Sequence, residues 1–294
     1  ISSPRSRPQM TDSFVLPSIA PLAATSDVWF VDIWGVIHNG VRPCASSVTA
    51  CQAFRKQGGT VLLVTNAPRP RDSVRRQLDR VGVAGAAYDE IVSSGDVSRE
   101  LIEACAGRRI LHIGPERDLP LFAGLGAVPG ATANDAEVAV CTGLYDDETE
   151  TPADYAAMLA TLKSRAVPMI CANPDRTVER DGHIIYCAGA VAAAYEALGG
   201  TVSYAGKPFQ PIYELALELA GTLRSAPVTR ERVLAIGDGI ATDIAGAVNF
   251  GVRAVFIASG VHVRLGESMA DAAARLFGAK SAPQPIAVMS EFVW

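Results

Sequence analysis

A short apolar run that supplies one carboxylate and then breaks at a glycine limits most strongly how this chain can fold. Residues 28–36 read Val-Trp-Phe-Val-Asp-Ile-Trp-Gly-Val. The β-branched and aromatic residues predict a buried strand with Asp32 at its carboxyl end. In an open α/β sheet, ligands bind at that end, because a crevice forms where the connections leave the strands. Asp32 is therefore a candidate for chemistry, with a turn-capping aspartate as the alternative.

The composition describes a chain that can bury a large core and handles small molecules. It has 294 residues, 49% of them hydrophobic, enough for one large or two modest domains. The net charge of −5 and the absence of Lys/Arg runs argue against nucleic-acid and anionic-membrane partners. No apolar run reaches the length of a membrane span. The six cysteines are scattered, without zinc-site spacing, so a reducing, cytoplasmic compartment is expected.

Strand-like and helix-like segments alternate along the chain, which predicts an α/β fold with a parallel sheet. Residues 1–25 are expected to be a cloning remnant ahead of Met10 followed by a lead-in. The stretch between the second and third polar motifs is too long for a simple connection and should form its own small α/β domain. The predicted division is a core of residues 26–107 and 200–294, with an inserted domain of residues 108–199.

Three later motifs supply polar residues that could form a site together with Asp32. One apolar run ends in Thr65 and Asn66, a tight loop carries Lys207, and a third run ends in Asp238, with Asp243 following. A nucleophile strand, a threonine strand, a lysine and an acidic strand, in that order, resemble the haloacid dehalogenase (HAD) superfamily. The insert between the second and third motifs resembles subclass IIA, the branch of NagD, pyridoxal phosphatase and para-nitrophenylphosphatase. This resemblance implies a Rossmann-like HAD core with a C2-type α/β cap.

The resemblance also implies roles for the motif residues. Asp32 would be the nucleophile that forms an aspartyl-phosphate, splitting one displacement into two easier ones. Mg²⁺ would be held by Asp32, Asp238 and the backbone carbonyl of Trp34, with Asp243 as an outer or water-mediated partner. The Thr65 hydroxyl, the Asn66 backbone N–H and the Lys207 charge would stabilise the transferring phosphoryl group. Helix capping is the alternative role for the two later aspartates.

One residue departs from the phosphatase pattern of this branch. Those enzymes usually read Asp-x-Asp-Gly, and the second acid protonates the leaving alcohol. Here that position is Trp34, which makes the motif Asp-x-Trp-Gly. Three interpretations follow: a phosphatase using another group, with His38 as the candidate; a slow hydrolase of substrates with good leaving groups; or a catalytically weak or inactive phospho-ligand binder. A metal-independent dehalogenase is a further alternative, because those relatives carry an aromatic residue here.

The function expected from these motifs is a phosphoric monoester hydrolase acting on a small substrate such as a sugar phosphate, a nucleotide or pyridoxal phosphate. Substrate contacts are expected from Trp34 and Asn66 in the core and from four cap residues: Asn173, Asp175, Arg176 and Gly189. Arg69 could steer phosphate or cap its helix, and Asp147 is expected to face solvent. The resemblance further implies a homodimer formed through the cap.

Overall fold

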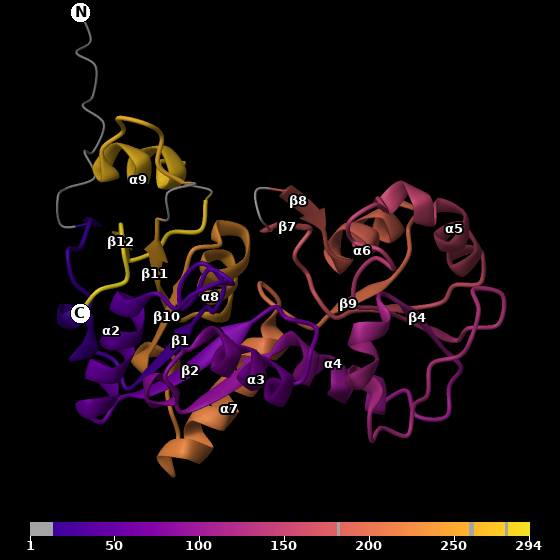
Figure 1. Cartoon of the computed structure of the whole chain (residues 1–294), viewed down its shortest axis with the longest axis horizontal. Coiled ribbons are helices and arrows are strands. Elements are labelled where there is room, and N and C mark those ends of the chain that lie inside the picture. Colours follow the sequence, from indigo (N-terminus) through magenta and orange to yellow (C-terminus); the bar gives the residue numbers. More distant parts are fainter. Residues whose placement is uncertain (1–13, 181–182, 259–261, 280–281) are drawn as a thin grey trace, which may run out of the picture.

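The predicted buried strand, β1 (Val28–Val31), lies inside a six-stranded sheet (Figure 1). The computed structural model describes residues 14–180, 183–258, 262–279 and 282–294. Within them, all ladders of this sheet are parallel, in the order β12-β11-β10-β1-β2-β3. The other strands are β2 (Thr60–Thr65), β3 (Glu90–Ser93), β10 (Val233–Gly237), β11 (Arg253–Ile257) and β12 (Ala287–Met289).

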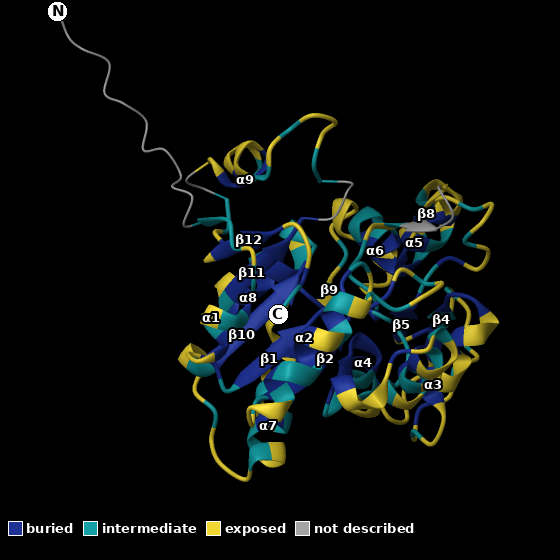
Figure 2. Cartoon of the chain, turned by 60° about the vertical axis from the view of Figure 1, so that its left-hand side comes forward, coloured by how far each residue is buried: buried dark blue, intermediate teal, exposed yellow. Residues whose placement is uncertain are grey.

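Helices cover both faces of this sheet, which explains why its strands are apolar on both sides. Alternate residues of β1 point to opposite faces: Trp29 packs in one apolar cluster, and Phe30 packs in the other. Figure 2 shows the central strands as buried, whereas the helices combine buried, intermediate and exposed residues. The helices of the core are α1 (Ala20–Ala23), α2 (Ala45–Lys56), α3 (Arg71–Val81), α4 (Ser94–Glu103), α7 (Gln210–Arg224), α8 (Ala245–Phe250) and α9 (Met269–Phe277).

A second parallel sheet forms the other lobe in Figure 1, in the order β4-β5-β6-β9. Apolar clusters pack on both faces of this sheet, and one of them includes Ile102 of α4. Its elements are β4 (Ile110–Ile113), β5 (Val138–Cys141), α5 (Ala156–Ser164), β6 (Met169–Cys171), β7 (Thr177–Arg180), β8 (His183–Tyr186), α6 (Ala188–Ala197) and β9 (Val202–Tyr204). We call this lobe the cap and the other lobe the core.

The structure corrects two details of the predicted organisation. The cap does not end at residue 199, because β9 pairs with β6 and extends the cap sheet past that point. The cap also contains the antiparallel β7–β8 pair, apart from its parallel sheet. The lead-in belongs to the core: the Ile19 side chain is fully buried, and the Leu16 N–H donates to the Val288 carbonyl. The predicted cloning remnant lies outside the described residues.

The described helices include none that is both long and apolar enough to cross a membrane.

Candidate active site

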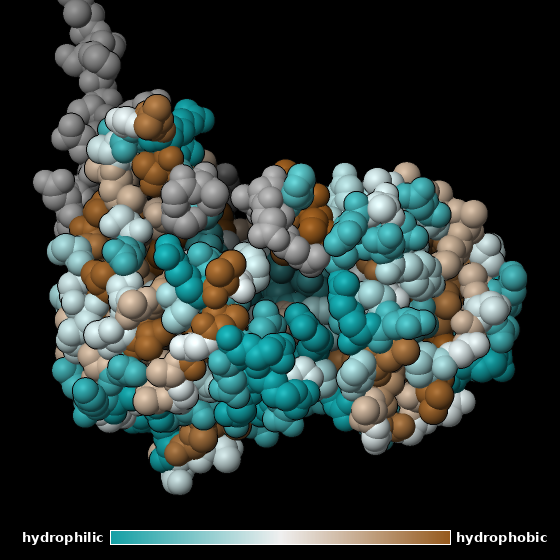
Figure 3. Space-filling model, viewed as in Figure 1, coloured by the Kyte–Doolittle hydropathy of each residue, from teal (hydrophilic) through white to brown (hydrophobic). Residues whose placement is uncertain are grey.

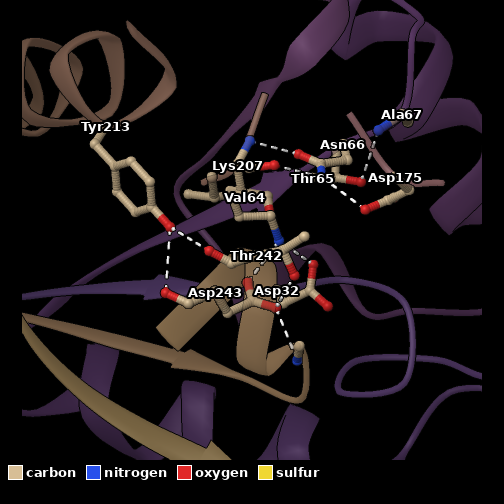
Figure 4. Close-up of polar contacts among 11 residues, drawn as sticks. Asp32, Val64, Thr65, Asn66, Ala67, Asp175, Lys207, Tyr213, Thr242 and Asp243 are labelled. Atoms are coloured by element: carbon tan, nitrogen blue, oxygen red, sulfur yellow. Dashed lines mark hydrogen bonds and ion pairs between the residues drawn. The ribbon is translucent and has the colours of Figure 1, made fainter. Parts of the chain in front are cut away.

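The carboxyl ends of three adjacent strands bring the predicted motif residues together. β1 pairs with β10 on one side and with β2 on the other, all parallel. Asp32 therefore follows β1 at the same edge where Thr65 ends β2 and Asp238 follows β10. Lys207 reaches this edge from the loop after β9, as the close-up in Figure 4 shows.

Lys207 is the charged centre of the site. Its side chain is buried, with the residue 3% exposed, and its Nζ lies 2.5 Å from Asp32 Oδ1 and 2.7 Å from Asp243 Oδ1. It also donates to the Val64 carbonyl at 3.1 Å. Burial lowers the pKa of Lys207, but the Asp243 and Asp32 carboxylates outweigh burial and hold the pKa above its usual value. The lysine is therefore a fixed positive charge beside the proposed nucleophile.

Three carboxylates converge at the same place. Asp32, Asp238 and Asp243 each offer an oxygen, and the three oxygens lie within 4.8 Å of one another. Burial and the Asp243 charge raise the pKa of Asp32 well above its usual value and that of Asp238 to about 7. Lys207 supplies one positive charge to the three acids, so the group leaves room for a cation. An all-oxygen donor set of this kind suits Mg²⁺.

A glycine lets the loop after β1 approach this cluster. Gly35 has φ +82°, and a Cβ added to it would lie 2.1 Å from Asp238 Oδ2. A side chain at this position is therefore excluded both by backbone conformation and by space. The peptide that joins Trp34 to Gly35 consequently lies next to the acids, which is compatible with the predicted carbonyl ligand of Trp34.

Asn66 connects the β2 motif to the lysine loop and to the cap. Its Oδ1 accepts the Lys207 backbone N–H at 2.7 Å, and its Nδ2 donates to the Lys207 carbonyl at 3.1 Å and to Asp175 at 2.9 Å. The neighbouring Thr65 hydroxyl oxygen accepts the Ala67 N–H at 3.2 Å. The hydroxyl proton of Thr65 is therefore available to donate to a ligand.

Trp34 and His38 form a packed pair at the mouth of the site. The indole is 43% exposed and meets the His38 ring edge to face at 5.5 Å between centroids. Gly40, with φ +89°, makes room for the indole, because a Cβ there would lie 2.6 Å from the ring. His38 Nδ1 accepts the Gly40 N–H at 2.8 Å, and burial lowers the His38 pKa. His38 is therefore neutral with its proton on Nε2, which disfavours it as a general base.

A cavity of about 400 Å³ lies between the core and the cap. Figure 3 shows the hydrophilic hollow between the two lobes. All the predicted catalytic and metal-binding side chains line it, together with Trp34, Asn66, Asn173 and Asp175. Two predicted substrate contacts, Arg176 and Gly189, do not line the cavity. Arg176 is exposed to solvent. A Cβ on Gly189 would lie 2.1 Å from the Pro174 carbonyl oxygen, so Gly189 packs against the Pro174 backbone.

The cap contributes cavity-lining residues that the sequence analysis missed. The Asp147 carboxylate, expected to face solvent, lines the cavity and pairs with Arg117 at 2.5 Å. Asp118, Thr142 and Tyr186 line it as well. Arg69, considered as a phosphate-steering residue, joins them from the core. Because these residues come from separated segments, no local sequence pattern indicated that they meet.

Comparison with known proteins identifies the family. A haloacid dehalogenase-like hydrolase of *Brucella suis* has a solved structure with 42% sequence identity and a TM-score of 0.84, covering 95% of this chain and 100% of that one. The chain belongs to the haloacid dehalogenase-like hydrolase family. Two family profiles also match: "Haloacid dehalogenase-like hydrolase" over residues 29–127 and "HAD-hydrolase-like" over residues 204–284.

Other relatives of this HAD-like hydrolase are phosphatases. The D-glycerol 3-phosphate phosphatase of *Mycobacterium tuberculosis* is 26% identical over 243 residues, which are 82% of this chain and 65% of that protein. The chain thus spans about two thirds of the length of that curated relative. A solved glycerol phosphate phosphatase from *M. tuberculosis*, in complex with magnesium, shares the fold with a TM-score of 0.68 and 24% identity, covering 93% and 77% of the two chains. The 4-nitrophenylphosphatase of Thermotoga maritima shares the fold as well, with a TM-score of 0.70 and 21% identity, covering 92% and 96% of the two chains.

Proposed function

We propose that this HAD-like hydrolase is a Mg²⁺-dependent phosphatase that cleaves small phosphomonoesters through an aspartyl-phosphate on Asp32. The observation that best supports the proposal is the position of Asp32, which lines the cavity with one oxygen bound to Lys207 and with two more carboxylates beside it. A buried lysine and three converging acids are costly to keep unless they act on a ligand.

Asp32 is placed to act as the nucleophile. Lys207 binds Oδ1, and no hydrogen bond within the described chain reaches Oδ2. That oxygen attacks phosphorus, the ester P–O bond breaks, and its electron pair leaves with the alcohol oxygen. Water then attacks the aspartyl-phosphate, which releases phosphate and restores the Asp32 carboxylate.

The remaining groups neutralise the charge that the phosphate brings. Asp32, Asp238 and Asp243 would hold Mg²⁺, which supplies Lewis-acid neutralisation of the phosphoryl oxygens. Lys207 adds a positive charge that is fixed before the substrate arrives. The Thr65 hydroxyl donates its proton to a phosphoryl oxygen. The magnesium complex of the *M. tuberculosis* phosphatase supports the choice of metal.

Trp34 sets the kinetic character of the proposed reaction. An indole cannot protonate the leaving alcohol, and neutral His38 with its proton on Nε2 is a poor substitute. We therefore propose that turnover depends steeply on the acidity of the leaving group, with aryl phosphates cleaved faster than alkyl phosphates. Loss of acid catalysis costs roughly 10²–10⁴-fold. Trp34 also favours a second candidate, a phospho-ligand binder that keeps the metal-binding and phosphate-binding residues without useful turnover.

The test measures phosphate release from para-nitrophenyl phosphate and alkyl phosphates, with Mg²⁺ and with EDTA. Wild type should release phosphate only with Mg²⁺, and Asp32→Asn should lose at least about 10³-fold in kcat, as expected for a lost nucleophile. Asp79→Asn, on the exposed face of α3, is the control for removing a carboxylate.

Other outcomes would redirect the assignment. No release from any ester, with phosphate plus Mg²⁺ still raising the melting temperature, would establish the binder instead. Halide release from a 2-haloacid in EDTA would establish a dehalogenase. The homodimer proposed from the family resemblance is tested separately, by light scattering on the full chain.

A further inference from the structure

A buried carboxylate lines the cavity on its cap side and has no part in the proposed phosphoryl transfer. Asp118 lies in the short 3₁₀ helix Glu116–Phe122 and is 5% exposed. Its neighbour Glu116 is exposed and does not line the cavity. A buried charge is costly, so Asp118 requires partners on the protein or on a ligand.

Positive and polar side chains surround Asp118. Burial raises the Asp118 pKa, while the charges of Arg69 and Arg117 and the Thr142 hydroxyl act in the opposite direction. The Thr142 hydroxyl also lies 2.9 Å from His112 Nε2. Burial lowers the His112 pKa to about 4, so this ring is neutral and adds no charge beside Asp118.

The charges around Asp118 balance one another. Arg69 and Arg117 supply two positive charges, and Asp118 and Asp147 supply two negative charges to the same cavity wall. Arg117 already pairs with Asp147 at 2.5 Å. A wall with this balance offers no net attraction for a second phosphate or for a cationic group. It instead offers a carboxylate acceptor beside guanidinium donors, the combination that hydroxyl groups satisfy, because each hydroxyl both donates and accepts.

We propose that Asp118 is a specificity-determining residue that accepts a hydrogen bond from a hydroxyl of the leaving group, so that the substrate is the phosphomonoester of a neutral polyol or sugar. This inference rests on the proposed phosphatase function and narrows its substrate class. Arg69 of the core and Asp118 of the cap line the same cavity, and the charge of Arg69 acts on Asp118. Hydroxyl recognition therefore takes place across the junction of the two lobes.

Matched pairs of inhibitors test the proposal without requiring that alkyl phosphates turn over. The pairs are glycerol 3-phosphate with propyl phosphate, and sorbitol 6-phosphate with hexyl phosphate. Each pair shares a carbon chain and differs in the hydroxyls. The inhibition constant of each compound is measured against hydrolysis of para-nitrophenyl phosphate. In at least one pair, the hydroxylated member should bind wild type about 10- to 100-fold more tightly, the range for a hydrogen bond to a charged group.

Asp118→Asn should reduce that preference at least about tenfold, because it replaces the charged acceptor, and Glu116→Gln should retain the preference in full. Thr142→Val, which removes the hydroxyl beside Asp118, should reduce the preference by a smaller factor and serves as the test if Asp118→Asn does not fold. A wild type that does not distinguish either pair, or variants that keep the full preference, would overturn the inference alone. Absence of para-nitrophenyl phosphate hydrolysis by wild type would overturn the phosphatase proposal and this inference with it.

Discussion

Asn66 of the core donates its side-chain amide to the Asp175 carboxylate of the cap, 2.9 Å away. The same Asn66 side chain makes both of its other hydrogen bonds to the Lys207 backbone. A contact between the lobes is therefore part of the structure that positions the lysine. Asp175 also lines the cavity, so the position of the cap and the geometry of the phosphate site are coupled through one amide.

This coupling predicts a measurable interaction energy. Asn66→Ala, Asp175→Ala and the double variant form a double-mutant cycle, and we expect a coupling of about 1 kcal/mol in kcat/KM, the usual net value of one hydrogen bond. Asp175→Ala alone should mainly raise KM, because it removes a contact between the cap and the core but no group that binds the phosphate. Additive effects of the two substitutions would show that the contact carries no energy.

The carboxylate cluster predicts an unusual pH dependence of stability. The Asp238 pKa rises from 3.8 to about 7 in the folded protein. Between these values the folded state binds more protons than the unfolded state, so the free energy of unfolding without metal should fall as the pH rises from about 4 to about 7. Mg²⁺ should reverse this loss above pH 7 and have less effect at pH 5.5, where protons compete for Asp238.

Asp238→Asn tests the origin of that pH dependence. In EDTA at pH 8, the free energy of unfolding of the variant should exceed that of wild type by on the order of 1 kcal/mol or more. Its melting temperature should therefore be higher. It should also lose most of the stabilisation by Mg²⁺. The measurement is thermal unfolding at pH 5.5 and pH 8, with Mg²⁺ and with EDTA. An Mg²⁺ effect as large in Asp238→Asn as in the exposed control Asp79→Asn would exclude Asp238 as a ligand.

Lys207→Met should destabilise the protein as well as inactivate it. The substitution keeps a long side chain but leaves Asp32 and Asp243 without their buried cation, which typically costs about 3–5 kcal/mol. Lys207 lowers the folded-state pKa of Asp32, so removing the lysine raises that pKa further, and the loss should be larger at pH 8 than at pH 5. Urea unfolding at the two pH values measures the difference. Equal losses at both would mean that lost packing, not charge, is responsible.

Trp34→Asp introduces the acid that the first motif lacks. We expect the ratio of alkyl to aryl phosphate hydrolysis to rise about 10²-fold, the lower range for general acid catalysis. The half-exposed indole packs on His38 and Gly40, so some stability should also be lost. Trp34→Asn is the matched control, because it removes the same packing without supplying an acid. The same ratio in both variants would show that an acid at this position does not assist the leaving group.

Most of the main site was predictable because three of its residues follow or end strongly patterned segments. The apolar runs before Asp32, Thr65 and Asp238 identify buried parallel strands, and parallel strands place their carboxyl ends at one edge. Local sequence was therefore sufficient to bring these side chains together. Lys207, which lies in a loop, was placed by the order of the motifs and by resemblance to a family.

The cap wall was not predictable in the same way. Asp118 and Asp147 lie in irregular or short 3₁₀ segments, where no periodicity indicates which side is buried. Their partners are Arg69, Arg117 and Thr142, and Arg69 and Thr142 come from different elements. The cap boundary was wrong for a related reason: β9 has only three residues, too few to show a strand pattern before its pairing with β6 is known.

The position of β9 makes the two ends of the cap unequal. On the entering side, the chain passes from α4 into β4 with no residue of the central chemistry between them. On the leaving side, only Ala205 and Gly206 separate the last cap strand from Lys207. Exchanging this cap for that of a relative would therefore be a clean graft at its first junction only. At the second junction, the last strand of the transplanted cap would determine the backbone position of Lys207. The exchange would therefore change the substrate range and the catalytic rate together.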